Sequence, residues 1–343
     1  MGVDTFFEGK VILVTGGAGS IGSTLVKNLL KLGPEAIRIL DNNETGLFDL
    51  EQDLQADRIR TFVGDVRDKE RLLRAFEGVD IIFHAAALKH VPLCEYNPFD
   101  AVKTNVIGTQ NVIDAALDRE VRKIILISTD KAVDPVNVMG ATKLLAERLM
   151  ISANNYKGNR DTAFSCVRFG NVLNTRGSVI PLFKKQISSG GPITLTDPEM
   201  TRFMMSIPKA IDLVLKAAEM ATGGEIFILK MPVLRMDDLA EATIKTWAST
   251  YGYNTNQILI KTIGKRPGEK LYEALMTEEE AENAYDNEEM FIVLPQQDKM
   301  NGRNTCMLPS TFEKARVMAY TSSHAALLGK EEIKVLLQRS SYD

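Results

Sequence analysis

Two neighbouring side chains of opposite charge, Asp130 and Lys131, follow an apolar run at 124–127 after Ser128 and Thr129. The run has the length and composition of a buried strand. In an open α/β sheet, ligands bind in the crevice beyond the carboxyl ends of the strands. A carboxyl group and an amine at that place suit acid and base catalysis in one pocket. An exposed pair that caps a turn is the alternative interpretation.

The segment after this pair predicts a helix that begins at about residue 138 and ends near residue 150. Met139 and Lys143 are four residues apart, so they share one face of that helix near the crevice. The acid, the two lysines and the methionine are therefore expected to lie close together.

A glycine-rich turn forms a second candidate site near the N-terminus. A short apolar strand is expected over residues 11–14, and a leucine-rich helix follows the turn. Bare backbone lets a pyrophosphate approach, and the N–H groups and dipole of the helix stabilise its charge. The residues predicted to bind the phosphates of a dinucleotide are Gly16, Gly19, Ser20, Ile21 and Gly22.

Asp41 ends the second expected strand, residues 36–40. It follows Gly22 by about 20 residues, the spacing of the acid that binds the adenosine ribose. A carboxylate there accepts hydrogen bonds from both ribose hydroxyls and repels a 2′-phosphate. No arginine follows Asp41 at once. NAD is therefore favoured, and NADP is the alternative.

Two further strands are expected over residues 59–63 and 80–83. Asp65, after the first of them, suits either the adenine amino group or a cap on its own loop. Small side chains after the second would let a cofactor lie against the backbone; these are Ala85 and Ala86.

Lys89 and His90 follow at the same end of the sheet. They are read either as solvated loop residues or as part of a substrate cleft. A helix is expected over residues 98–117, and Asn105 lies on its apolar face. A polar residue in that position usually satisfies a backbone group, which is the role predicted for it.

Alternating strands and helices from residue 10 to about 169 predict an α/β protein with a doubly wound parallel sheet, a Rossmann fold, and a smaller C-terminal α+β substrate lobe. We expect the dinucleotide-binding domain over 1–170, with sheet-completing segments from about 201–230. The substrate-binding lobe and tail are expected over 171–200 and 231–343.

Basic turns in the predicted substrate lobe would suit a ligand with two phosphates. The candidates are Arg176, Arg202 and Arg266. For each arginine alone, a surface salt bridge is the alternative.

The composition narrows the class of protein. The chain has 343 residues, 45% of them hydrophobic, and a net charge of -4, which gives no electrostatic footprint for nucleic acid. No apolar run reaches the ~18 residues that span a bilayer, and the N-terminus lacks the pattern of a signal peptide. Cys94, Cys166 and Cys306 have no metal or disulfide spacing. We expect reduced thiols and a soluble, cytoplasmic protein without membrane or metal partners.

The chain resembles the UDP-N-acetylglucosamine 4,6-dehydratases, which are extended short-chain dehydrogenases/reductases. The most specific matches are Ser128–Lys131 together with Leu88-Lys89-His90-Val91-Pro92. The resemblance extends to about residue 295. Further matching stretches are Thr15–Gly22, 64–68, 84–87, 95–98, Gly140–Lys143, 168–172, 176–181, 200–203 and 266–271.

The resemblance implies a reaction on a UDP-sugar. Tightly bound NAD takes hydride from carbon 4 of the sugar and returns it to carbon 6, so the cofactor is regenerated each turnover. Lys131 is implied as the base at carbon 5 and Asp130 as the acid at the carbon 6 oxygen. Lys143 is implied to hold the nicotinamide ribose. The matching stretches also assign Val66 to the cofactor and Asn171 and Glu269 to the substrate.

The sequence departs from the superfamily pattern at Met139, which replaces the catalytic tyrosine of Tyr-x-x-x-Lys. A thioether cannot take the proton of the carbon 4 hydroxyl. Thr129, Asp130 or a water is left to relay that proton. The departure weakens a 4-epimerase interpretation, which depends on the tyrosine.

Several alternatives stay open. The tail and Arg176-Gly177-Ser178 resemble the members that invert carbon 5, whereas Asp41 and Met139 resemble those that retain it. Inversion is the prediction, and retention is the first alternative. A nucleotide-sugar 4-epimerase and a non-catalytic dinucleotide sensor follow. Because relatives assemble, we also expect a homo-oligomer.

Overall fold

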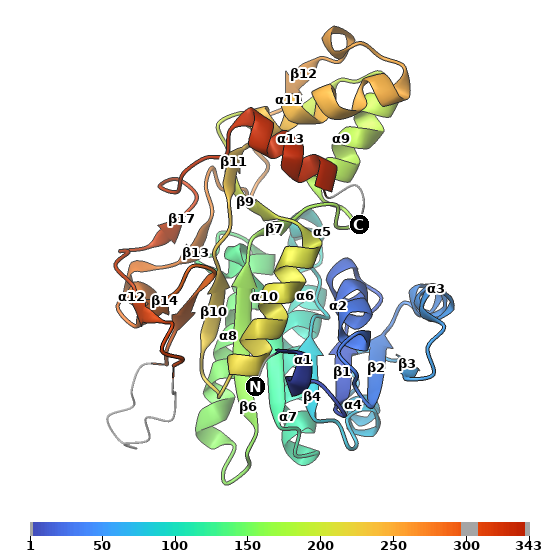
Figure 1. Cartoon of the computed structure of the whole chain (residues 1–343), viewed down its shortest axis with the longest axis vertical. Coiled ribbons are helices and arrows are strands. Elements are labelled where there is room, and N and C mark those ends of the chain that lie inside the picture. The colour runs from blue at the N-terminus through green and yellow to red at the C-terminus, as the bar shows by residue number, and fades with distance from the viewer. Residues whose placement is uncertain (1–2, 296–307, 340–343) are drawn as a thin grey trace.

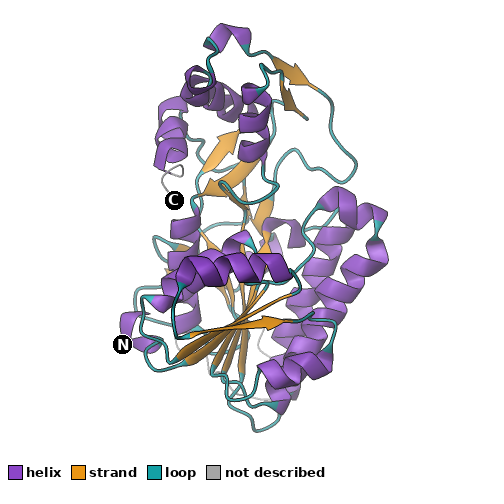
Figure 2. Ribbon diagram, turned by 90° about the vertical axis from the view of Figure 1, so that its right-hand side faces the viewer, coloured by secondary structure: helices purple, strands orange, loops and turns teal. Residues whose placement is uncertain are grey.

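A twisted sheet forms the centre of the computed structural model, which describes residues 3–295 and 308–339 (Figures 1 and 2). Its parallel part reads β3 (Ile59–Val63), β2 (Ala36–Asp41), β1 (Val11–Thr15), β4 (Ile81–His84), β5 (Lys123–Thr129), β6 (Ala163–Phe169) and β10 (Ile226–Leu229). Strands covered on both faces are near-continuous apolar runs, and every residue of β6 is buried. The predicted doubly wound α/β fold is confirmed.

Helices cover both faces of this sheet (Figure 2). One layer contains α2 (Ser20–Leu30) and α10 (Ile207–Met220), which contact each other. Helix α1 (Val3–Phe6) contacts α10. Another contains α4 (Lys69–Ala75), α7 (Gly108–Asp118) and α8 (Val138–Tyr156), with α5 (Val91–Tyr96) and α6 (Pro98–Ala101) beside α8. Helix α3 (Glu44–Leu54) packs on β2 and β3.

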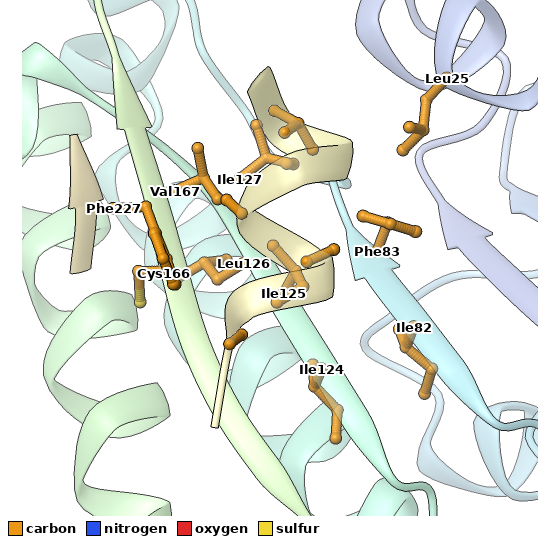
Figure 3. Close-up of a cluster of buried hydrophobic side chains, with 14 of the residues drawn as sticks. Leu25, Ile82, Phe83, Ile124, Ile125, Leu126, Ile127, Cys166, Val167 and Phe227 are labelled. Carbon is orange, nitrogen blue, oxygen red and sulfur yellow. The ribbon is translucent and has the colours of Figure 1, made fainter. Parts of the chain in front are cut away.

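The core lies between the strands and the helices. Figure 3 shows Phe83 on β4, Ile125 and Ile127 on β5 and Val167 on β6 within one buried cluster. At ~25 cal/mol per Å² of buried apolar area, such side chains supply the main stabilisation of the fold. Cys94 and Cys166 are buried and free, as expected, and Cys306 lies outside the described residues.

The large sheet extends beyond β10 with antiparallel strands. They are β15 (Met290–Val293), β14 (Ala284–Asp286) and β16 (Glu313–Lys314). Strand β10 lies within the predicted sheet-completing segment. The other three come from 231–343, the range expected for the substrate lobe, so that range divides between lobe and sheet. The reason is strand pairing, because β15 hydrogen-bonds to the backbone groups that β10 would otherwise leave unpaired at the edge of the parallel sheet.

A second, smaller core lies above the sheet in Figure 1. It is built from α9 (Val179–Ser188), α11 (Met236–Trp247), α13 (Lys330–Arg339) and β8 (Ile193–Leu195). The exposed strand β12 (Ile260–Thr262) pairs in parallel with β8. A three-stranded sheet between the two cores contains β7 (Asn171–Val172), β9 (Thr201–Met205) and β11 (Val233–Arg235). Near them, β13 (Ala274–Met276) pairs with β17 (Tyr320–Thr321), and α12 (Glu278–Ala281) follows β13.

Candidate active site

Asp130 and Lys131 lie where β5 ends and a single 3-10 turn, Asp130–Ala132, begins. The Thr129 hydroxyl donates to Asp130 Oδ1 over 2.9 Å, and Lys131 Nζ donates to the same oxygen over 2.9 Å. Asp130 is 0% exposed. Within the described residues, its Oδ2 has no hydrogen-bond partner. Asp130 is therefore buried and the Lys131 side chain is 24% exposed, so the pair is not an exposed turn cap. One oxygen of the Asp130 carboxylate is left for a ligand.

A second buried carboxylate faces Lys131, and the sequence analysis missed it. Glu273 Oε1 lies 3.8 Å from Lys131 Nζ and 3.9 Å from Arg202 Nε. Burial lowers the pKa of Lys131, but the charges of Asp130 and Glu273 outweigh burial and raise it above its ordinary value. The lysine is therefore held as an ammonium between carboxylates. The only local sequence signal for Glu273 is a charge placed directly before an apolar strand.

A cleft of about 190 Å³ opens beside Lys131. Four of the seven predicted substrate-binding residues line it. The lining includes Lys131, Asn171, Arg202, Arg266, Glu269 and Glu273. Arg202 also donates to the backbone carbonyls of Lys270 and Leu271, which ties the basic turn to β9. The cleft therefore combines cations for phosphates with Lys131, and the buried Asp130 lies directly behind the lysine.

The other three predicted substrate residues form a separate group next to the glycine turn. Lys89 Nζ donates to the carbonyl of Arg176 over 2.8 Å, and the His90 ring packs against Gly177. The backbone N–H of Arg176 donates to Ser20 Oγ over 3.0 Å. These residues join the loop before α9 to the start of α2.

Helix α8 begins at an Asn137 side chain that accepts from Gly140 N over 2.8 Å. One turn further, the buried Lys143 Nζ donates to the Ile127 carbonyl over 2.7 Å. Burial lowers the pKa of Lys143 to about 8, although Glu147 opposes the shift. Met139 is 3% exposed and packs with Cys94 and Ala101, so it fills a helix interface.

Asn105 lies in a π-helical stretch, Val102–Ile107, that interrupts the helix expected over 98–117. Its amide accepts from Leu88 N over 2.8 Å and donates to Leu88 O over 3.0 Å and to Thr142 Oγ1. The predicted backbone-satisfying role is confirmed. The extra backbone residue of a π turn reorients this side chain, and no sequence period indicates it.

The glycine turn is suited to a dinucleotide. Gly16 has φ +67°, and a Cβ there would lie 2.6 Å from Ala86 N, so the turn touches the small-residue end of β4. Gly19 precedes the first turn of α2, which contains no acidic residue. The N–H groups there suit an anion. The predicted residues Ser20, Ile21 and Gly22 form that first turn.

Asp41 is bonded to the same turn. Its Oδ2 accepts from Ala18 N and its Oδ1 from Asn43 N, both over 2.9 Å. Each oxygen has a further lone pair that suits a ribose hydroxyl. Asp65 accepts from the backbone N–H and guanidinium of Arg67, which is the loop-cap arrangement. The adjoining Val66 is buried.

His84 is a second residue that the sequence analysis did not assign. Its ring lies between the hydroxyls of Thr15, at 2.7 Å, and Thr109, at 3.1 Å. Burial lowers the pKa of His84 to about 3, and the nearby charge of Lys143 adds to the shift. It is therefore a neutral link from β4 to α7. The described residues contain no group of three His, Cys, Asp or Glu able to hold a metal.

Arg168, on β6, is the centre of a buried ion cluster behind the site. It donates to both oxygens of Glu147 and of Glu280, and to the Leu275 carbonyl. The cluster ties α8, which carries Lys143, to the segment that carries Glu273. Both oxygens of each carboxylate in the cluster accept a hydrogen bond, whereas Asp130 and Glu273 each keep one oxygen without a partner among the described residues.

Replacing Arg168 with leucine is expected to destabilise the fold by about 3–5 kcal/mol, because it leaves the buried Glu147 without a counter-charge. Urea unfolding followed by circular dichroism measures this loss. The control is Arg160→Leu at an exposed position, with an expected change within about 0.5 kcal/mol. Equal midpoints for the two variants would show that the cluster is not structural.

The fold and the glycine turn define a dinucleotide-binding Rossmann protein. Comparison with known proteins narrows this class. Residues 12–295 match the family described as polysaccharide biosynthesis protein. An uncharacterized membrane protein of Methanocaldococcus jannaschii is 61% identical over 99% of this chain and 98% of its own length. Within residues 3–295 and 308–339, no helix is long and apolar enough to cross a membrane.

Two relatives bear names or structures closer to the chemistry. The UDP-N-acetylglucosamine 4,6-dehydratase (inverting) of Campylobacter jejuni is 41% identical, over 95% of this chain and 96% of its own. The crystal structure of Pen from Bacillus thuringiensis superposes with a TM-score of 0.90 at 42% identity, covering 98% and 99% of the two chains. Proteins named UDP-glucose 4-epimerase also match. That of Rickettsia rickettsii is 39% identical, over 98% of this chain and 97% of its own length.

The chain therefore belongs to the polysaccharide biosynthesis protein family, within the extended short-chain dehydrogenases/reductases. The family resemblance seen in the sequence is confirmed.

Proposed function

We propose that the protein is an NAD-dependent nucleotide-sugar 4,6-dehydratase, acting on UDP-N-acetylglucosamine and inverting carbon 5. The observation that carries the proposal is the pair of a buried Asp130 and a partly exposed Lys131, beside a cleft with Arg202 and Arg266. A dehydratase needs an acid and a base in one pocket, whereas a dinucleotide sensor needs neither. The product is a UDP-4-keto-6-deoxy-hexosamine for surface glycan synthesis.

NAD, when bound, supplies the hydride acceptor for carbon 4 and the hydride donor for carbon 6. The first turn of α2 would hold its pyrophosphate, Asp41 its adenosine ribose and Lys143 its nicotinamide ribose. The Lys143 ammonium gives one hydrogen bond to Ile127 O, which leaves two N–H groups for hydroxyls. NADP is the alternative that Asp41 disfavours through charge repulsion.

The Thr129–Asp130 hydrogen bond offers a route for the proton that a tyrosine would otherwise take. Thr129 Oγ1 takes the carbon 4 hydroxyl proton as its own proton passes to Asp130 Oδ1. Asp130, now a neutral acid, protonates the carbon 6 hydroxyl, which leaves as water. The carboxylate is thereby restored.

Lys131 completes the proton balance. In its neutral form, Nζ takes the carbon 5 proton after carbon 4 is oxidised and later releases it to solvent. Carbon 5 regains a proton from solvent on the opposite face, which inverts it. Because the active form has Asp130 ionised and Lys131 neutral, activity is expected to rise with pH as the lysine loses its proton. The raised pKa of Lys131 places that rise at alkaline pH.

The names of relatives support the finer parts of the proposal. The Campylobacter jejuni relative is named as inverting, which favours inversion over retention. The Rickettsia relatives named as 4-epimerases make epimerisation the second candidate. Met139 weighs against it, because that reaction depends on the absent tyrosine. Homo-oligomeric assembly and a cytoplasmic location stay predictions.

The test is incubation of the purified protein with UDP-N-acetylglucosamine and no added cofactor, followed by mass spectrometry. A product lighter by one water is expected if the cofactor is tightly bound and regenerated. An isomer of unchanged mass would establish the epimerase instead. Bound dinucleotide with no turnover on any of several UDP-sugars would favour the sensor.

Replacing Thr129 with valine tests the proton route. The change keeps the shape of the side chain and removes the hydroxyl, so kcat is expected to fall by about 10²–10³-fold with KM nearly unchanged. Thr129→Ser, which restores a hydroxyl, is the matched control and should retain most of the activity. Full activity of the valine variant would rule out this route and leave Asp130 itself or a water as the relay.

A further inference from the structure

Glu273 is a buried carboxylate that the proposed chemistry does not yet use. It lies at the entry to β13 and is 3% exposed. Of its two oxygens, Oε2 lacks a hydrogen-bond partner in the part of the chain that the structure describes. Leaving a carboxylate buried and incompletely paired is costly. Such a group calls for a functional explanation.

The backbone of Glu273 is fixed from both sides by one residue of the tail. Its N–H donates to Ser322 Oγ over 2.9 Å, and its carbonyl accepts from Ser322 N over 2.8 Å. Ser322 Oγ also lies 2.8 Å from Thr201 Oγ1 on β9. The tail and β9 therefore hold the carboxylate at a set distance from the end of β5.

The side chain faces three cations and one anion. Lys131 Nζ lies 3.8 Å and Arg202 Nε lies 3.9 Å from Oε1, and Lys270 and Asp130 act on it through their charges. The groups that face Lys131 are Asp130 from its own turn, Glu273 from the β13 segment and Arg202 from β9. Glu273 is thus the only carboxylate near Lys131, within the described residues, that the proton route does not neutralise.

We propose that Glu273 is a positioning residue that acts through Lys131: it is the counter-ion of the lysine ammonium at the stage when Asp130 is neutral. This inference rests on the proposed function. When Lys131 takes the carbon 5 proton, Asp130 already carries the proton from carbon 4. The new ammonium then lies beside Arg202 without its usual partner, and the Glu273 carboxylate balances its charge.

The decisive variant is Glu273→Gln, which keeps the size of the side chain and removes its charge. We expect kcat to fall by about 10- to 100-fold, less than the ~10²–10³-fold for losing a group in direct contact with the reacting atoms. KM should change little, because the missing charge acts at the proton-transfer step. Glu273→Asp should recover part of the rate.

The pH profile separates this role from a structural one. Without the Glu273 charge, burial and Arg202 lower the pKa of Lys131, so the alkaline rise in kcat/KM should move to lower pH. Glu280→Gln is the matched control, because Glu280 is a carboxylate only 13% exposed and is paired with Arg168 in the same segment. That variant should lose stability without moving the rise.

A measurement without substrate keeps the two proposals apart. Nitrogen NMR of labelled lysine side chains, with Lys131→Met to assign the signal, follows the titration of Lys131 directly. A titration at lower pH in Glu273→Gln than in the wild type supports the inference even if UDP-N-acetylglucosamine is not the substrate. An unchanged titration of Lys131 would overturn the inference. So would an unchanged kcat in Glu273→Gln, provided that the wild type is active.

Discussion

Replacing Asp130 with asparagine is expected to lower kcat for the loss of water by about 10²–10⁴-fold, the range for a general acid. Asparagine keeps the shape of the side chain and can still accept the Thr129 hydrogen bond. It can neither receive the carbon 4 proton nor protonate the carbon 6 hydroxyl. Deuterium uptake at carbon 5 should fall in parallel, because that proton is acidic only after carbon 4 is oxidised. Steady-state assays by mass spectrometry measure both.

Asp134 provides the matched control for this variant. It lies in the same loop, is exposed and has φ +44°, a backbone conformation that asparagine tolerates. Asp134→Asn should stay within about twofold of the wild-type kcat, the range expected for an exposed site. An Asp130→Asn enzyme with more than about a tenth of the wild-type kcat would contradict the acid role.

Replacing Lys131 with methionine should have an effect of similar size, about 10²–10⁴-fold in kcat, because no base is left for carbon 5. The cleft beside Lys131 should admit a small primary amine. Added ethylamine is therefore expected to restore part of the activity of Lys131→Met and none of that of Asp130→Asn. Rates as a function of amine concentration and pH provide the measurement.

Lys185→Met, at an exposed position on α9, is the control for loss of a lysine and should behave as the wild type does. Melting curves must accompany Lys131→Met, since the variant removes the ammonium from the buried Asp130. Deuterium uptake at carbon 5 at the wild-type rate in Lys131→Met would show that another group is the base.

The parallel sheet was predictable because its strands are apolar runs with clear ends. Val11–Thr15 and Lys123–Thr129 are of this kind. The strands β14 and β16 at one end of the sheet are short and partly polar, so only the pairing of β14 with β15 and of β16 with β14 defines them. The π-helical stretch at Asn105 was equally hidden, since a helix with one extra residue in a turn keeps nearly the same apolar pattern.

The site follows the same division. Asp130 and Lys131 are adjacent in sequence, and a strand end places them together. Glu273 approaches Lys131 only because Ser322 and β9 fix the start of β13. That contact depends on tertiary packing, which no local pattern encodes. Lys89 and Arg176 were predicted to face the substrate. Their hydrogen bond to each other could not be predicted, because it also depends on tertiary packing.

The most direct test of the dehydratase is the reaction with UDP-N-acetylglucosamine in heavy water, stopped early and analysed by mass spectrometry and NMR. The proposed function predicts a product lighter by one water, with solvent deuterium at carbon 5. Carbon 6 should carry the hydrogen that began on carbon 4, because the same cofactor returns it. A product of unchanged mass, or deuterium at carbon 6 in place of that hydrogen, would contradict the proposal.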